Sequence, residues 1–325
     1  MESRFILEKI LILLFFFFSA VLSGCTGSGF FGQKSLDGPL SVPSEYVFFP
    51  KTSKQTHFKK QENLANVLAE FSSKKHSNKE KAELLLLSGT ICDELGLESL
   101  AKAMYMDAIT YNPTYYAPYE VLGTYFFREG KIGDAVEALS SAECLNTEEK
   151  DPYLYLHNGI VMAYTGHTKF AYEDLQKFYA DDDKDPYRLL FYYFATWNYL
   201  GEEKAHNLLL DYYKKVIHTE VEKNFGFNFV KLYLGEISEG KIFSDILKVR
   251  NNDDLFLEHL CEAYYYIGKI KLIKEQDKLA YDYFRLCENT HKYNFIEYSL
   301  SKYEMARLEK KYSKKHRVSI EELSN

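Results

Sequence analysis

The sequence predicts an all-α fold, a solenoid of antiparallel helix pairs that ends in a C-terminal capping helix. Small and bulky residues recur at fixed positions about every 34 residues, which is the mark of a helical repeat. Glycines and prolines fall between the amphipathic segments and punctuate them. The 28 Tyr and 24 Phe supply large surfaces suited to helix packing and to peptide binding.

Residues 1–24 are predicted to be a signal peptide. The uncharged segment 10–22 follows Arg4 and Lys9 and ends in small residues. It is shorter than the roughly 20 apolar residues that a membrane span requires, so export is favoured over a retained span.

The next residues resemble the bacterial lipobox, which reads Leu22-Ser23-Gly24-Cys25 here. The alternative is an ordinary cleavage site beside a chance cysteine. The resemblance implies that Cys25 is lipidated with more than one acyl chain, such as palmitate, and that these chains form a stable anchor. Thr26 at the following position implies the outer membrane, with the mature chain facing the periplasm.

Composition argues against some partners. The formal charge is −7 and the pI about 5.8, whereas a nucleic-acid-binding protein favours a basic surface. The remaining cysteines form no C-x-x-C pair or zinc spacing, and we interpret them as small buried hydrophobes. A bridge between two of them remains an alternative in an oxidising compartment. The four are Cys92, Cys144, Cys261 and Cys287, and the bridge would join the last two.

Residues 25–58 read as the lipidated cysteine and a flexible spacer, because glycine and proline are frequent and no helical period appears. Residues 59–76 then read as an amphipathic helix. Its apolar positions fall at i, i+3, i+4 and i+7: Leu64, Val67, Leu68 and Phe71.

Residues 77–184 contain three regular repeats. In the frame that starts at Ala82, Gly89 stands at position 8 and Tyr105 at position 24; the next frame starts 34 residues later, at Tyr116. A third frame starts at Pro152. The period and residue types match the tetratricopeptide repeat, in which small residues let helices A and B approach closely.

The remaining segments are less regular. Residues 185–252 read as degenerate helical repeats, with a helix from Asp185-Pro186 to Leu200 that Gly201 ends. Residues 253–312 read as a further repeat, which starts at Cys261, and a capping helix over the end of the stack. Residues 313–325 read as a basic, disordered tail.

In such arrays the helix A positions line a concave groove, which predicts a peptide-binding surface. The alternative is that these side chains only pack against neighbouring helices. The carboxylate clamp of chaperone-binding repeats is excluded, because Leu86 and Thr90 stand where it needs Lys and Asn. The candidate groove residues are Glu120, Phe127, Arg128, Tyr153, Leu156 and Tyr164.

The sequence indicates no catalytic residue, no cofactor and no metal site. An EF-hand loop that starts at Asp181 would have Pro186 where glycine is needed. His259 and Glu262 lie one turn apart, but no H-E-x-x-H motif accompanies them.

The irregular segments resemble the NlpI family of tetratricopeptide lipoproteins of the Gram-negative outer membrane. The similar segments are DPYRLLFYY from Asp185, GFNFVKLYLGEIS from Gly226, LEHLCEAYYYIGKI from Leu257 and NFIEYSLSKYEM from Asn294.

This resemblance implies a non-enzymatic homodimeric adaptor. Its partners would be a periplasmic C-terminal processing protease and peptidoglycan hydrolases, notably endopeptidases, so that it affects hydrolase turnover and cell division. Helix 59–76, through Leu64, Val67, Leu68 and Phe71, would form the dimer contact, although capping the first repeat is an equal alternative. A structural lipoprotein of another outer-membrane or assembly complex remains the competing hypothesis.

Overall fold

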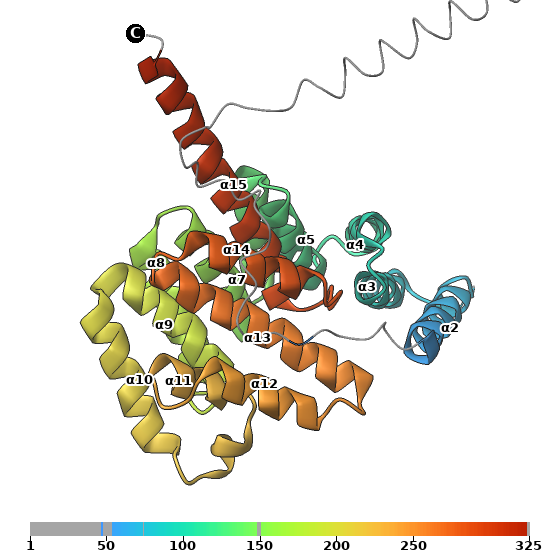
Figure 1. Cartoon of the computed structure of the whole chain (residues 1–325). Coiled ribbons are helices and arrows are strands. Elements are labelled where there is room, and N and C mark those ends of the chain that lie inside the picture. The colour runs from blue at the N-terminus through green and yellow to red at the C-terminus, as the bar shows by residue number, and fades with distance from the viewer. Residues whose placement is uncertain (1–46, 48–53, 74, 148–150, 324–325) are drawn as a thin grey trace, which may run out of the picture. The chain divides into compact units, whose positions relative to one another are not determined.

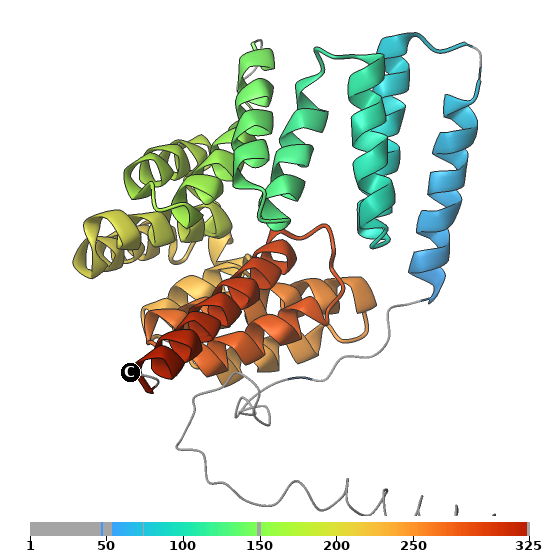
Figure 2. The same cartoon turned by 90° about the horizontal axis from the view of Figure 1, so that it is seen from above.

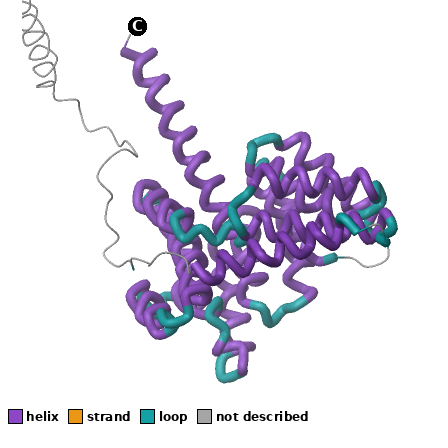
Figure 3. The backbone as a smooth tube through the Cα atoms, turned by 90° about the vertical axis from the view of Figure 1, so that its right-hand side faces the viewer, coloured by secondary structure: helices purple, strands orange, loops and turns teal. Residues whose placement is uncertain are grey.

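The computed structural model describes residue 47 and residues 54–73, 75–147 and 151–323. Within these residues every regular element is a helix and no strand occurs (Figures 1 and 3). The helices are α2 (Lys54–Phe71), α3 (Asn78–Glu94), α4 (Glu98–Tyr111), α5 (Tyr116–Arg128), α6 (Ile132–Leu145), α7 (Pro152–Tyr164), α8 (Thr168–Asp181), α9 (Pro186–Leu200), α10 (Glu202–Val216), the short 3-10 helix η1 (Glu220–Lys223), α11 (Phe227–Tyr233), α12 (Glu239–Lys248), α13 (Asp253–Ile273), α14 (Asp277–Glu288) and α15 (Ile296–Leu323).

The helices pair as the repeat pattern predicts. The closest packing joins α3 to α4, α5 to α6, α7 to α8 and α13 to α14, which are helices A and B of the four predicted repeats. Helices α9 and α10 form a further pair in the degenerate region, and α9 spans Pro186–Leu200 as predicted. Figure 2 shows the first repeats side by side. The fold is therefore an all-α solenoid of the tetratricopeptide type, as predicted.

Glycine at position 8 allows the two helices of each repeat to touch. A Cβ added to Gly89 would lie 2.4 Å from Cε1 of Tyr105, the bulky residue at position 24 of the same repeat. The same addition at Gly159 would meet Leu175 Cγ at 2.6 Å. Distances this short are steric overlaps, so the predicted pairing of a small residue with a bulky one is confirmed.

The turns from helix A to helix B use a left-handed residue. Gly96, Gly130 and Gly166 occupy this place with φ of 73° to 86°, where glycine has no steric penalty. In the turn from α13 to α14 this left-handed position is occupied by Glu275, with φ of 56°. A side chain in this region is strained, and this turn lies beside a cavity that is described below.

Helix α2 starts at Lys54, five residues before the predicted boundary, so residues 54–58 belong to the helix and not to the spacer. Its apolar face packs against the first repeat. Leu64 joins the cluster around Tyr105, and the Phe71 ring meets Tyr111 edge-on at 5.7 Å. Leu64, Val67, Leu68 and Phe71 are all half-buried, and Leu64 and Phe71 pack on the first repeat as the capping alternative expects.

Helix α15 runs to Leu323, so the prediction of a disordered tail after residue 312 is wrong for residues 313–323. The segment YSKKHRVSIEEL contains no glycine or proline, and nothing in it ends a helix.

One cysteine also differs from the prediction. Cys92, Cys261 and Cys287 are buried, but Cys144 is exposed, because Ala138, Leu139 and Ala142 form the inward stripe of α6. Cys261 and Cys287 are free thiols whose sulfur atoms lie 3.5 Å apart.

The predicted leader and Cys25 lie outside the described residues. Within the residues that are described, no helix combines the length and the apolar character needed to span a bilayer.

Candidate functional site

Helix α15 lies against the concave face of the second and third repeats, where the sequence places an open groove. The Tyr303 ring stacks on Phe127 at 4.4 Å, and Tyr164 donates a hydrogen bond of 2.7 Å to Glu304 Oε1. Arg128 donates to Ser299 Oγ at 3.3 Å. The last helix was predicted to cover the end of the stack. It does pack on α14, but it also fills part of the groove.

A buried ion cluster fixes α15 in this position. The Glu304 side chain has no exposed surface, and it accepts from Lys269 Nζ at 2.6 Å, from Tyr164 and from Arg307 Nε at 2.9 Å. Burial alone would raise the pKa of Glu304, but the charges of Lys269 and Arg307 hold it below its usual value. The carboxylate therefore stays ionised and fully satisfied, as a buried charge requires.

Two cavities remain in the groove beside α15, separated by Ile160 and Leu300, which line both. We name the first the Arg128 cleft; its volume is about 250 Å³. One wall comes from α3, α4, α5 and α7, and the other comes from the α14–α15 loop and the first two turns of α15. Its lining is Thr90, Asp93, Tyr105, Val121, Thr124, Tyr125, Phe127, Arg128, His157, Ile160, Val161, Tyr293, Asn294, Phe295, Ile296, Ser299 and Leu300.

The polar floor of the Arg128 cleft is built around Asp93. Tyr105 donates to Asp93 Oδ2 at 3.0 Å, and Tyr125 donates to the other carboxylate oxygen. Burial raises the pKa of Asp93, and the two hydroxyl groups oppose that rise. At the side, His157 Nδ1 lies 2.9 Å from Glu120 Oε1. Side-chain partners therefore hold these acidic groups in place.

We name the second cavity the Trp197 cavity; its volume is about 360 Å³. It lies between α7, α9, α13 and α15, and its walls include Phe191, Phe194 and the single tryptophan of the chain. Lys269 and Arg307 also line it, but both are paired with Glu304. The cavity is aromatic, and its two cations are already paired.

The six predicted groove residues divide into three groups. Phe127, Arg128 and Tyr164 line the two cavities and contact α15. Glu120 and Leu156 are buried and serve packing, the alternative that the sequence left open. Tyr153 is 51% exposed and lies against Phe178, outside both cavities.

Sequence reasoning missed the wall that α15 contributes. Ser299, Tyr303 and Glu304 meet residues that precede them by 140 to 176 positions in the chain, and no local pattern predicts such a contact. One signal was present: Glu304 stands on the apolar face of α15 between Leu300 and Leu308, where a carboxylate needs buried partners.

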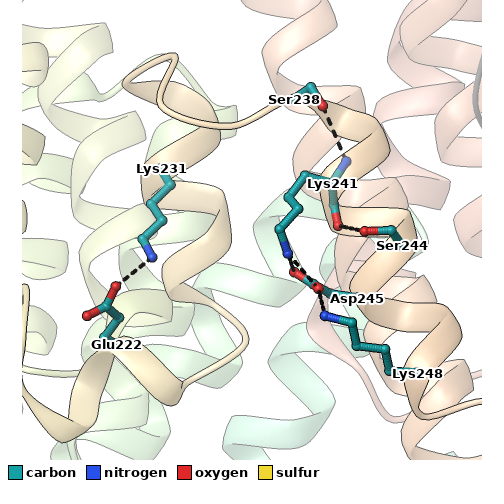
Figure 4. A network of polar contacts seen from close by, with 7 residues as sticks. All are labelled: Glu222, Lys231, Ser238, Lys241, Ser244, Asp245 and Lys248. Carbon is teal, nitrogen blue, oxygen red and sulfur yellow. Dashed lines mark hydrogen bonds and ion pairs between the residues drawn. The ribbon is translucent and has the colours of Figure 1, made fainter.

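A separate polar network on η1, α11 and α12 is a surface feature. Asp245 accepts from Lys241 at 2.6 Å and from Lys248 at 2.5 Å, and Lys231 binds Glu222 at 2.9 Å (Figure 4). The two pairs of Asp245 have i,i+4 and i,i+3 spacing, and such pairs contribute about 0.2–0.5 kcal/mol each, so they support α12. No cluster of three His, Cys, Asp or Glu side chains in the described part of the chain could hold a metal ion.

Glu297 is a buried carboxyl group at the start of α15. It accepts from Tyr266 at 3.1 Å, and Glu262 lies in the same region, bonded to Tyr187 at 2.7 Å. Burial raises the pKa of Glu297 to about 7, and burial together with the charge of Glu297 raises the pKa of Glu262. The junction of α9, α13 and α15 therefore holds protons that the unfolded chain would release.

We expect stability to rise as pH falls from about 7.5 to 5. The pKa of Glu297 is about 7 in the folded state, against 4.5 for an ordinary glutamate. Protonated Glu297 therefore stabilises the folded state fully below pH 4.5, and this stabilisation is lost as pH rises through 7. The full effect is on the order of 3 kcal/mol. Urea denaturation across this range measures it. Glu297→Gln should flatten the profile and be more stable than the wild type at pH 8; an unchanged profile would contradict the assignment.

Comparison with known proteins supplies neighbours in structure. No protein-family model matches the chain. A tetratricopeptide repeat protein from Parabacteroides merdae is 16% identical, covers 78% of this chain and 99% of its own, and has a TM-score of 0.44. The C-terminal part of a repeat protein of the same type from Cytophaga hutchinsonii is 15% identical, covers 73% and 79%, and has a TM-score of 0.39.

A chain of the APC/C hetero-tetramer Cut9–Hcn1 is 18% identical, covers 78% of this chain and 46% of its own, and has a TM-score of 0.43. These similarities are distant and concern the fold alone. The helix pairs, their glycine contacts and the 34-residue frame carry the conclusion that the chain folds as a helical solenoid of the tetratricopeptide type.

Proposed function

We propose that the protein is a lipid-anchored periplasmic scaffold of the NlpI kind. In this proposal Cys25 carries the anchor in the outer membrane. The repeats bind a C-terminal processing protease and peptidoglycan endopeptidases, and so affect hydrolase turnover and cell division. The support is the Arg128 cleft, a concave site with both apolar and polar walls on a repeat scaffold. The leader, the lipobox-like segment and the four NlpI-like segments support the location and the partner class.

Affinity capture from a Gram-negative envelope extract tests this function. Thr90→Trp should fill the mouth of the Arg128 cleft, because Thr90 is an exposed cleft residue whose hydroxyl donates to Leu86 O of its own helix. We expect the wild type to recover the protease and the hydrolases, and this variant to lose most of that recovery.

Thr110→Trp is the matched control. Thr110 is also exposed, and it makes the same bond to the carbonyl four residues earlier, but it lies on α4 and lines neither cavity. Recovery should be unchanged in this variant. Capture of assembly components in place of the protease and hydrolases would support the competing structural role, and equal capture by both variants would remove the cleft from the function.

The proposed homodimer needs a contact other than the inner face of α2, which packs on the first repeat. The outer face of the same helix carries Phe58, whose side chain is 67% exposed. In this proposal Phe58 contributes to the dimer contact. Light scattering on Phe58→Asp tests it: a monomer supports the contact, and an unchanged dimer removes α2 from it.

A further inference from the structure

Two buried cysteines meet between α13 and α14. Their sulfur atoms lie 3.5 Å apart although the residues are 26 positions apart in the chain, and neither residue has exposed surface. Cys287 Sγ donates to the Cys261 carbonyl oxygen at 3.2 Å and lies 3.6 Å from the Glu297 carbonyl oxygen. The pair therefore lies where α13, α14 and the first turn of α15 come together.

The repeat frame explains why these two side chains face each other. Cys261 is position 1 of its repeat, and Cys287, 26 residues later, is position 27. The same positions of the first repeat hold Ala82 and Ala108, which are fully buried in one cluster. The start of helix A thus lies close to the end of helix B in both repeats. Because alanine fills this space in the first repeat, packing alone does not require two sulfur atoms in the last one.

The sulfur atoms can reach bonding distance through side-chain rotation. The S–S bond of a disulfide is about 2.0 Å long, so the gap must close by about 1.5 Å. Rotation about the Cα–Cβ bond, between the staggered positions of a cysteine side chain, moves the sulfur atom further than this. The hydrogen bond that Cys287 would give up is weak, because a thiol is a weak donor.

Burial determines when such a bond can form. The thiolate, and not the thiol, is the group that attacks an oxidant. Burial raises the pKa of Cys261 well above its ordinary value, so the folded thiol stays protonated as well as shielded from solvent. The pair must therefore be oxidised before α13 and α14 close on each other. A chain that folds in an oxidising compartment meets this condition.

We propose that Cys261 and Cys287, which are free thiols in the structure, form a disulfide that joins α13 to α14 in the mature protein. Two S–H bonds break and one S–S bond forms. The two electrons and two protons pass to an oxidant that is itself a disulfide, and its S–S bond becomes two thiols. This inference rests on the proposed function, because a periplasmic location supplies such an oxidant. Cys92 and Cys144 stay reduced.

The bridge stabilises the part of the fold that carries α15. A cross-link restricts the unfolded chain and so favours the folded one. The loop that follows α14 contributes Tyr293, Asn294 and Phe295 to the Arg128 cleft, and α15 begins directly after it. Because Cys287 lies at the end of α14, the bridge fixes the point from which this wall of the cleft starts.

Oxidative refolding of the purified full chain tests the proposal. The chain is unfolded with a reductant and refolded with a mixture of reduced and oxidised glutathione, and the remaining thiols are then alkylated in denaturant. We expect mass spectrometry to find the peptides of Cys261 and Cys287 joined, and Cys92 and Cys144 alkylated. The bridged chain should unfold at a temperature roughly 5–10 °C above that of the reduced chain.

Two variants separate the bridge from packing. Cys261→Ala combined with Cys287→Ala gives the last repeat the alanine pair of the first, so it should fold, and its unfolding temperature should not respond to reductant. Cys92→Ala is the matched control, because Cys92 is also a fully buried cysteine on helix A of a repeat. This variant should keep the joined peptides and the response to reductant.

Several outcomes would overturn the proposal. Alkylation of both Cys261 and Cys287 after oxidative refolding does so, and so do comparable amounts of joined peptides that contain Cys92 or Cys144. A wild type whose unfolding temperature does not respond to reductant does so as well. Envelope capture by a chain that lacks the joined peptides leaves the adaptor standing and removes the bridge. Joined peptides together with failed capture leave the bridge standing and remove the proposed partners.

Discussion

Replacing Gly89 by alanine is expected to lower the free energy of unfolding by about 2 kcal/mol, although alanine is the better helix former. The added Cβ would lie 2.4 Å from Tyr105 Cε1, and the Tyr105 ring cannot retreat, because it is buried and its hydroxyl is bonded to Asp93. Overpacking a core costs about 1–3 kcal/mol, and a larger side chain such as valine should cost more. Alanine gains at most about 1 kcal/mol in helix propensity. Chemical denaturation followed by circular dichroism measures the balance.

Gly133→Ala is the matched control, and it should have the opposite sign. Gly133 lies in the first turn of α6, and nothing would lie within 4 Å of its added Cβ. Only the higher helix propensity of alanine then acts, so the free energy of unfolding of this variant should rise by a few tenths of a kcal/mol. If both variants change stability in the same direction, the close approach of α3 and α4 is not what requires glycine at position 89.

Local pattern was enough to predict the paired helices. The glycine at position 8 and the bulky residue at position 24 lie in consecutive helices, so their contact closes within one repeat. Gly201 ends α9 with φ of 89° for a similar local reason. Even the degenerate region followed the pattern, because Asp185 accepts from the Tyr187 backbone N–H and starts α9 in the usual way.

Local sequence pattern does not predict contacts between segments that are far apart in the chain. The sequence predicts a C-terminal helix but not the face it covers, since Tyr303 and Phe127 meet only through the whole fold. As a result the open groove of the prediction becomes two cavities on either side of Ile160 and Leu300. Tyr153 was assigned to the groove from its repeat position alone, and it lies outside both cavities.

Some of the predicted groove residues line a cavity and others are buried in helix packing, and the difference has a physical reason. Positions on helix A of a repeat face inward, but what they meet depends on the element that lies opposite. Leu156 is buried against its neighbours, whereas Arg128 meets the first turn of α15 and a cavity. The sequence could identify Arg128 as a groove residue. Its contact with Ser299 of α15 could not be predicted without the position of that helix.

Lys269→Met is expected to lower the free energy of unfolding by about 3 kcal/mol at neutral pH. Methionine keeps the apolar length of lysine, so the main change is the loss of a charge 2.6 Å from Glu304 Oε1. Glu304 has no exposed side-chain surface, and removing one partner of a buried pair costs about 3–5 kcal/mol. Arg307 and Tyr164 still bind the carboxylate, which places the expected cost at the lower end. Denaturant unfolding measures it.

The dependence on pH separates this mechanism from a packing defect. The pKa of Glu304 is lowered in the folded protein, so its ion cluster contributes stability above the usual carboxyl range and loses it as pH falls. Without Lys269 the buried carboxylate can take up a proton, and the cost of the substitution should shrink between pH 7 and pH 4. A packing defect would cost the same at both.

Two further variants complete the test. Lys169→Met removes the charge of an exposed pair with Glu173 at 3.6 Å and should change stability by less than about 0.5 kcal/mol. Lys269→Met combined with Glu304→Gln should be more stable than Lys269→Met alone, because the orphaned charge is gone. If the double variant is instead as unstable as the sum of the two single changes, Lys269 and Glu304 do not act as a pair. The cluster then does not explain how α15 is held against the repeats.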